Sequence, residues 1–194
     1  MMREPSRFWT PLVLAGLLCL GAAPAATGCG FHAPLGVQLD GMYPGSLTVA
    51  VALRKAADSG VIDAAALQAP GKRRALYIDS VGRLQQLRKT LAASSAAAEL
   101  PAGFSLGYVE SRLWTRYSQS DGRVHADIHT DGPADGEAVV LTGAPVVTEL
   151  LAGRLSVERA LADGMILIVG NESEKTAIRR VFDDVSMAPR ISSR

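Results

Sequence analysis

A helical stripe of apolar residues is the strongest pattern in the chain. Between residues 77 and 91, apolar side chains recur every three or four positions, with charged and amide residues between them. The stripe consists of Tyr77, Val81, Leu84, Leu87 and Leu91. Such spacing puts all five side chains on one side of an α-helix. We expect the alanine- and serine-rich residues 92–98 to extend this helix and Pro101 to stop it.

Two shorter helices are expected before this one. Ser46 is a suitable N-cap for the apolar residues that follow it, and Gly60 ends that helix. Asp63 is expected to cap a second helix, which runs to Leu67.

The period changes to two after these helices. Apolar residues alternate with smaller or polar ones over 104–108 and again over 124–129, and residues 113–119 are also extended. Alternation of this kind is typical of half-buried β-strands. Residues 120–122, Ser-Asp-Gly, predict a tight turn between two of the strands, and residues 137–142 predict a further strand.

The C-terminal third combines helices with one buried strand. Helices are expected over 145–151 and 156–162, with Ser156 capping the second, and the apolar run 165–169 predicts a buried strand. Ser173 is expected to cap a last helix, whose apolar stripe consists of Ile178, Val181, Phe182 and Val185. Helices and antiparallel strands segregated in this way predict an α+β fold, in which helices cover an antiparallel-rich sheet.

The first 28 residues have the features of a secretory signal peptide. Arg3 and Arg7 supply positive charge, residues 12–20 form an uncharged apolar run, and small residues fill 21–28. The apolar run is shorter than the about 20 residues that a transmembrane helix needs. We therefore predict an exported protein of the periplasm or cell envelope.

Cys29 offers a second way of processing this segment. Residues 26–29, Ala-Thr-Gly-Cys, resemble a bacterial lipobox, in which the cysteine is lipidated and becomes the first residue. Small residues at 23–26 also suit an ordinary signal peptidase, so both routes stay open. Since Cys19 lies in the removed segment, Cys29 would be a lone exported thiol, and lipidation accounts for it. We predict a membrane tether at Cys29.

The domain organisation follows from these boundaries. A signal peptide over 1–28 precedes a Gly- and Pro-rich arm over 29–45, a single domain over 46–188 and a tail over 189–194. Removal of the signal peptide leaves 166 residues and a formal net charge of 0, because two arginines and one glutamate are lost from a chain of net charge +1. A neutral chain with 5% aromatic residues lacks the basic footprint of a nucleic-acid-binding protein.

A series of motifs in the last third resembles the C-terminal half of the sterol carrier protein-2 (SCP-2-like) domain. That family commonly has a strand, a helix ending in Gly-Lys/Arg-Leu, a second helix, a Gly-Lys-Leu strand, a Gly-Asn pair and a closing amphipathic helix. The counterparts here are 137–142, 150–155 (LLAGRL), 156–162 with Gly164, 165–169, Gly170-Asn171 and 177–182. Met165-Ile166 stands where the family has Lys-Leu. The earlier strands extend the resemblance to residues 104–185, which divides the domain into a helical part over 46–100 and an SCP-2-like part over 104–188.

The resemblance implies a sheet covered by helices with an apolar tunnel between them. Such a domain binds a lipid or another apolar small molecule and needs no catalytic residue, metal or cofactor. The residues that it places on the tunnel are Leu106, Tyr108, Leu113, Val140, Leu150, Leu151, Leu155, Leu161, Ile166, Ile168, Ile178 and Phe182. Apolar residues at these periods also form ordinary packed cores, so core packing is the alternative role for each of them.

Two other sets of residues give alternative functions. His125, Asp127 and His129 alternate along one strand, and two histidines with a carboxylate suit a metal-dependent enzyme. However, residues i and i+4 of a strand lie roughly 13 Å apart, so a bulge or a ligand from another strand such as Glu110 would be needed.

The second alternative is a structural or assembly lipoprotein that docks onto another envelope protein. It rests on a segment that interleaves basic and aromatic residues, namely Arg112, Trp114, Arg116 and Tyr117. An exposed Trp114 would favour this alternative, whereas a buried Trp114 is the ordinary place for a large aromatic residue.

Overall fold

A computed structural model describes residues 43–67 and 73–187 of the chain. The predicted signal peptide, Cys29 and the tail lie outside the described residues, as does most of the arm. The helices are α1 (Ser46–Asp58), α2 (Arg73–Ala93), α3 (Ala144–Leu151), α4 (Val157–Ala162) and α5 (Glu172–Met187), with short 3-10 helices η3 (Ala64–Leu67) and η4 (Ala97–Glu99). The strands are β1 (Gly103–Tyr108), β2 (Leu113–Ser120), β3 (Arg123–Thr130), β4 (Ala138–Thr142) and β5 (Leu167–Val169).

The five strands form one mixed sheet in the order β3-β2-β1-β4-β5. β1 pairs with β4 in parallel, and the pairs β1–β2, β2–β3 and β4–β5 are antiparallel. The predicted tight turn joins β2 to β3, where Asp121 and Gly122 have φ values of 51° and 68°. The α+β prediction with an antiparallel-rich sheet is therefore confirmed.

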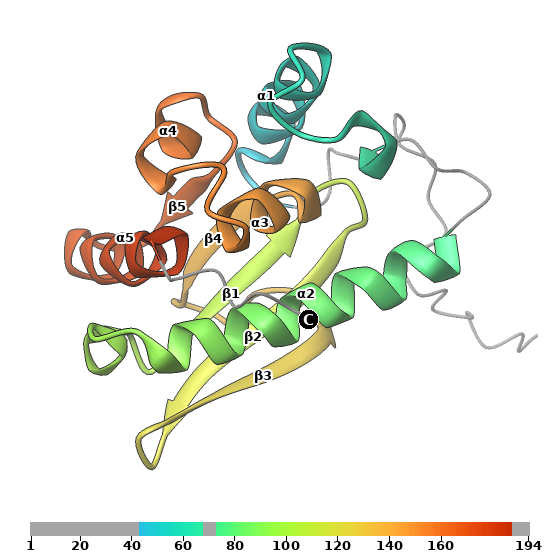
Figure 1. Cartoon of the computed structure of the whole chain (residues 1–194). Coiled ribbons are helices and arrows are strands. Elements are labelled where there is room, and N and C mark those ends of the chain that lie inside the picture. The colour runs from blue at the N-terminus through green and yellow to red at the C-terminus, as the bar shows by residue number, and fades with distance from the viewer. Residues whose placement is uncertain (1–42, 68–72, 188–194) are drawn as a thin grey trace, which may run out of the picture.

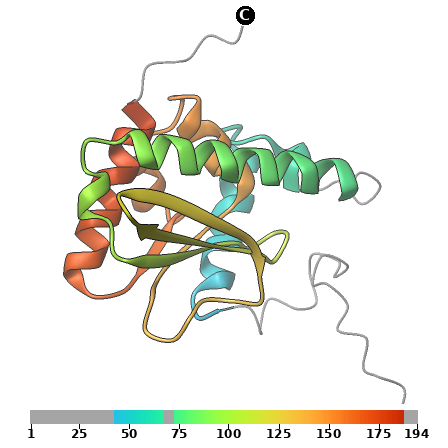
Figure 2. The same cartoon turned by 90° about the horizontal axis from the view of Figure 1, so that it is seen from below.

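A layer of helices covers one face of the sheet. α2 runs across β1, β2 and β3 and packs against α3 and α5 (Figure 1). Seen from below, α2 lies wholly on one side of the strands (Figure 2). Tyr117 of β2 donates a hydrogen bond to the Leu84 carbonyl of α2, and Phe104 of β1 packs edge-on against Phe182 of α5. The core of the protein therefore lies between this face and these helices.

The apolar stripes predicted for α2 and α5 supply the side chains that these helices bury in the core. Leu84, Leu87 and Leu91 of α2 are fully buried. The predicted α5 stripe, Ile178, Val181, Phe182 and Val185, is buried as well. Burial of such side chains contributes roughly 1.5–3 kcal/mol each relative to exposure, so these stripes fix both helices on the sheet. In the part of the chain that the structure describes, no helix is long and apolar enough to cross a membrane.

Two predicted helix caps are wrong. α1 begins at Ser46, but its N-cap is Gly45 with φ 93°, and the Ser46 hydroxyl is buried without a hydrogen-bond partner. At the start of α5, Asn171 takes the place expected for Ser173. The Asn171 side-chain oxygen accepts from the Glu174 N–H at 2.9 Å, and the Glu174 carboxylate accepts from the Asn171 N–H at 2.9 Å. This reciprocal pair is a capping box. The caps at Asp63 and Ser156 are confirmed.

Two elements are shorter than expected. α2 ends at Ala93 because Ser94 turns its hydroxyl to Asp184 of α5 at 2.6 Å and accepts from the Ala96 N–H. β5 begins at Leu167, although the whole run 165–169 is apolar. The N–H groups of Met165 and Ile166 donate back to the Ala160 carbonyl at the end of α4, so they are not free to pair with β4.

β1 also differs from the half-buried strand that its alternation predicted. All of its residues from Phe104 to Tyr108 are buried, because β1 lies between β2 and β4 in the middle of the sheet.

Candidate functional site

The strand residues that were placed on an apolar tunnel lie together on the helix-covered face. Leu106 pairs with Val140, Val140 pairs with Ile168, and Tyr108 pairs with Leu113. Side chains of directly paired residues lie on the same face of a sheet, and so do residues two apart in one strand. Since Phe104 of β1 packs on α5, its neighbours of the same parity face the helices. These five side chains therefore form one apolar surface under the helices.

The helix and loop residues of the predicted set complete this surface. Leu150, Leu155, Ile166, Ile178 and Phe182 are buried in the same hydrophobic cluster as the five strand residues. Leu151 and Leu161 are partly buried and pack against the cluster. The structure thus brings all twelve residues into one apolar region between the sheet and the helices. Their contact with a ligand remains a prediction.

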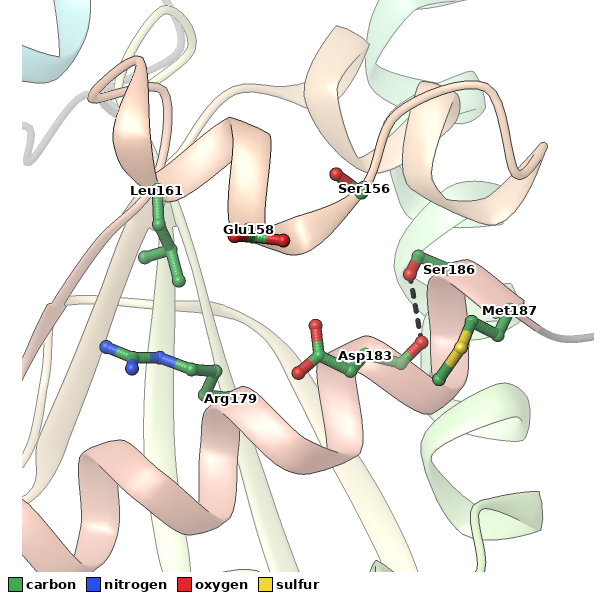
Figure 3. Close-up of a pocket in the computed structure, with 7 residues that line it drawn as sticks. All are labelled: Ser156, Glu158, Leu161, Arg179, Asp183, Ser186 and Met187. Carbon is green, nitrogen blue, oxygen red and sulfur yellow. Dashed lines mark hydrogen bonds between the residues drawn. The ribbon is translucent and has the colours of Figure 1, made fainter.

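A surface groove lies beside this region, between α4 and α5 (Figure 3). Its volume is about 650 Å³. Leu161 and Glu158 extend from α4 toward Arg179 and Asp183 of α5, and Ser156, Ser186 and Met187 complete the lining (Figure 3). Among these seven residues, the sequence predicted contact with a ligand only for Leu161.

The groove differs from an apolar tunnel in its chemistry. Glu158, Arg179 and Asp183 supply charge along its walls, and Met187 at one end is 72% exposed. Partial burial raises the pKa of Asp183, Arg179 opposes that shift, and the nearby acids Asp184 and Glu158 add to it. An open groove bordered by charged side chains is a poor container for an apolar chain. The apolar region under the helices is therefore the better candidate site.

Two polar residues adjoin the apolar region at the end of β1. The Tyr108 side chain is fully buried, and its hydroxyl makes no hydrogen bond. Glu110 accepts a hydrogen bond of 2.7 Å from the Ala144 N–H at the start of α3, whereas its second carboxylate oxygen is buried without a partner. Burial raises the pKa of Glu110 to about 7, against the lowering effect of the hydrogen bonds from Ala144 and from its own N–H.

Glu110 was not predicted as part of an apolar ligand site. From the sequence, Glu110 was expected only as an additional metal ligand. Its surroundings come from distant parts of the chain, because Gly143 and Leu53 of α1 lie next to its carboxylate. In the sequence, Glu110 appears only as a single acidic residue shortly after an apolar strand. This pattern does not distinguish a buried carboxyl group from an exposed one.

The proposed metal-binding histidines do not converge. β3 alternates as expected, with His125 and Asp127 exposed, but the β2–β3 register shifts next to His129. His129 adopts a φ of 76°, and its ring contacts that of Tyr77 on α2 with centroids 6.0 Å apart. Within residues 43–67 and 73–187, no three His, Cys, Asp or Glu side chains form a group that could hold a metal ion. The bulge that the metal hypothesis required is present, but it moves His129 toward α2.

The basic and aromatic segment of β2 is largely buried. Trp114 is 5% exposed and packs edge-on against Tyr43, and Tyr117 lies under α2. Arg116 donates to Glu137 through Nε at 2.7 Å, which places it in an ion pair on the sheet. The exposed tryptophan that would favour an assembly partner is not found.

Comparison with solved structures shows a partial likeness to sterol carrier proteins. No sequence model of a known family and no curated protein matches the chain. The sterol carrier protein domain 2 of Helicoverpa armigera is similar over 55% of this chain and 87% of its own, with 12% identity and a TM-score of 0.45. The ubiquinone synthesis protein UbiJ-SCP2 is similar over 55% of this chain and 94% of its own, with 16% identity and a TM-score of 0.41.

Part of a larger protein is also similar to this chain. The sec-alkylsulfatase Pisa1 from Pseudomonas sp. is similar over 45% of this chain, with 10% identity and a TM-score of 0.38. The matched region spans only 14% of the sulfatase. All of these values describe likeness of fold in about half of the chain.

Proposed function

We propose that this protein is an exported, lipid-anchored, non-catalytic module that binds a lipid or another apolar small molecule between its sheet and its helices. The observation that carries the proposal is the single apolar surface of β1, β2, β4 and β5 under α2, α3 and α5. Every strand residue that the SCP-2-like motifs assigned to a tunnel lies on it.

The physical basis of binding would be apolar burial. Transfer of a ligand's apolar surface out of water contributes about 25 cal/mol per Å², before the cost of ordering the ligand. Leu151 and Leu161 are the members of the twelve that keep partial exposure. They lie on α3 and α4 and mark the side from which a ligand would enter.

Native mass spectrometry of the protein purified from its own envelope tests binding directly. We expect a bound apolar molecule in near-stoichiometric amount, which organic extraction would release and identify. A protein that is folded and empty after gentle purification, and that takes up no lipid from vesicles, would contradict the proposal.

A matched pair of variants locates the ligand. Ile168 is 9% exposed on the inner surface, whereas Ile78 of α2 is 61% exposed. Ile168→Asp should abolish lipid retention, and Ile78→Asp should leave it unchanged. Ile168→Thr is a milder change for the case in which a buried carboxylate unfolds the domain. Unchanged lipid loading in a folded Ile168 variant would place the ligand elsewhere.

The anchor is tested separately at Cys29. Wild-type protein should fractionate with membranes and incorporate a labelled fatty acid, and Cys29→Ala should remove both properties. Incorporation of label into Cys29→Ala, or membrane association without it, would argue against a lipid tether at this residue. Lipid binding by the folded domain does not depend on this result.

A further inference from the structure

The end of β1 contains polar atoms that the protein leaves unsatisfied. Buried atoms without a hydrogen-bond partner include the Tyr108 hydroxyl, the second carboxylate oxygen of Glu110 and the Ser111 hydroxyl. Most buried polar atoms in folded proteins have a partner, and each exception calls for an explanation such as a bound molecule. Three such atoms within four consecutive residues therefore point to a partner that residues 43–67 and 73–187 do not provide.

Glu110 is held in place by the backbone of α3. One oxygen accepts from the Ala144 N–H at 2.7 Å, which fixes the carboxyl group against the first turn of that helix. A Cβ atom on Gly143 would lie 3.1 Å from the other oxygen and 2.8 Å from Leu53 of α1. The unpaired oxygen thus lies in apolar surroundings where α1 and α3 meet the sheet.

The charged groups around Tyr108 come from α2 and from the turn between β1 and β2. Asp79 and Arg83 of α2, and Glu110 itself, are close enough to act on the phenol electrostatically, together with the phenol of Tyr117. Arg83 Nε lies 3.7 Å from Asp79 and makes no hydrogen bond. Burial raises the pKa of Tyr108 well above its ordinary value, so its hydroxyl keeps its proton and can donate.

We propose that Tyr108 and Glu110 form the polar end of the ligand site, and that the ligand is an apolar molecule bearing an uncharged carbonyl group that accepts hydrogen bonds from both side chains. The inference rests on the proposed function, because it assumes that the ligand lies in the apolar region beside these residues. It adds the chemical class of the ligand and the residues that orient it.

An uncharged acceptor fits this end better than an ion does. The pKa of about 7 keeps a large fraction of Glu110 protonated near neutral pH, and its free oxygen then carries a donor proton. The Tyr108 hydroxyl and the protonated Glu110 carboxyl group are two neutral hydrogen-bond donors in an apolar environment, and such donors favour a neutral acceptor. A carboxylate ligand would be repelled by Glu110 and Asp79. Arg83 would offset this only in part, because it lies close to Asp79. A ligand cation would leave both donors unsatisfied.

A pair of fluorescent probes tests the carbonyl directly. Propionyl-dimethylaminonaphthalene carries a carbonyl whose hydrogen bonding shifts its emission to longer wavelength, and dimethylaminonaphthalene lacks that group. With the full mature protein at about pH 6, the acyl probe should bind about five- to tenfold more tightly than the plain probe, as expected for one or two net hydrogen bonds. Its emission should show a hydrogen-bonded carbonyl in an apolar site.

Variants of Tyr108 and Glu110 test whether these two residues cause the emission shift of the acyl probe. Tyr108→Phe should reduce the preference for the acyl probe about fivefold and move its emission to shorter wavelength, without changing affinity for the plain probe. Glu110→Gln keeps a donor and should retain the preference at about pH 8.5, where wild-type Glu110 is ionised and the preference should fall. Circular dichroism confirms that each variant is folded.

The results of these probe experiments distinguish failure of the carbonyl assignment from failure of the proposed function. Equal affinity of the wild type for both probes would overturn the carbonyl assignment while leaving an apolar carrier. An acyl-probe emission that moves neither in Tyr108→Phe nor on ionisation of Glu110 would do the same. Binding of neither probe, together with no lipid uptake from vesicles, would overturn both.

Discussion

Tyr117 and Leu84 join the sheet to its main covering helix through one buried hydrogen bond. The Tyr117 hydroxyl donates to the Leu84 carbonyl at 3.1 Å, 33 residues away in the sequence. Tyr108 lies on the same face of the sheet and is equally buried, yet its hydroxyl has no such partner. The two tyrosines therefore differ in what their hydroxyl groups contribute to stability.

Removing each hydroxyl should show this difference. Tyr117→Phe should lower the free energy of unfolding by about 1 kcal/mol, because a net hydrogen bond is lost. Tyr108→Phe should change it by less than about 0.5 kcal/mol or raise it, because a buried polar atom without a partner is removed. Urea denaturation followed by the fluorescence of Trp114 measures both. Equal losses in the two variants would show that Tyr108 has a partner in the folded protein without ligand.

Glu110 should make stability depend on pH. Its pKa is about 7 in the folded protein and near its ordinary value of 4.5 when unfolded, so the folded state binds the proton more tightly. The resulting stabilisation is complete below about pH 4.5 and is lost as pH rises through about 7, a change of up to about 3 kcal/mol. Denaturation midpoints between about pH 5 and pH 8.5 should therefore fall with rising pH.

Glu110→Gln provides the test of that assignment. Glutamine keeps an oxygen for the Ala144 N–H but does not titrate, so the decline across this range should largely disappear. Glu158→Gln, at an exposed position of α4, should retain the wild-type profile. A decline that persists in Glu110→Gln would mean that another group is responsible.

The fold class could be predicted from the sequence because it depends on local periodicity, whereas the residues of the inner apolar surface were those that the resemblance to the SCP-2-like domain implied. The stripes of α2 and α5 both repeat at the helical period. The α5 stripe is buried as expected, and so are Leu84, Leu87 and Leu91 of α2, whereas Tyr77 and Val81 are only partly buried. Strand residues such as Leu106, Val140 and Ile168 were assigned one by one, but β-strand parity and pairing place them on one face.

The remaining features depend on contacts between distant residues. The bulge at His129 arises from pairing with β2, so alternation within β3 could not reveal it. The early end of α2 depends on Asp184, about ninety residues after Ser94. Glu110 acquires its raised pKa from burial beside Leu53 and Gly143. In each case the deciding partner lies outside the window in which a sequence pattern is read.

The capping box of α5 predicts that Asn171 contributes more to stability than Ser173, although both residue types are suitable N-caps. Asn171→Ala should lower the free energy of unfolding by about 1 kcal/mol, because the Glu174 N–H loses its acceptor. Ser173→Ala should cost less than about 0.5 kcal/mol, since Ser173 is an exposed residue within the helix. Thermal denaturation of the two variants measures the contrast. A larger loss at Ser173 would restore it as the cap.

Two glycines predict opposite effects of the same substitution. Gly143 has an ordinary extended backbone, with φ −127°, but an added Cβ would lie 2.8 Å from Leu53 and 3.1 Å from the Glu110 carboxylate. Gly143→Ala should therefore destabilise the protein by about 1–3 kcal/mol through overpacking.

Gly82 lies within α2, and a Cβ there would have no atom within 4 Å. Gly82→Ala should stabilise the protein by about 0.5–1 kcal/mol, because alanine loses less backbone entropy than glycine in a helix. Chemical denaturation of both variants checks the pair. Because only Gly143 adjoins Glu110, the Gly143→Ala variant should also alter the pH dependence of stability, and Gly82→Ala should leave it unchanged. If Gly143→Ala proved neutral in both respects, the close packing of α1, α3 and the Glu110 carboxyl would be refuted.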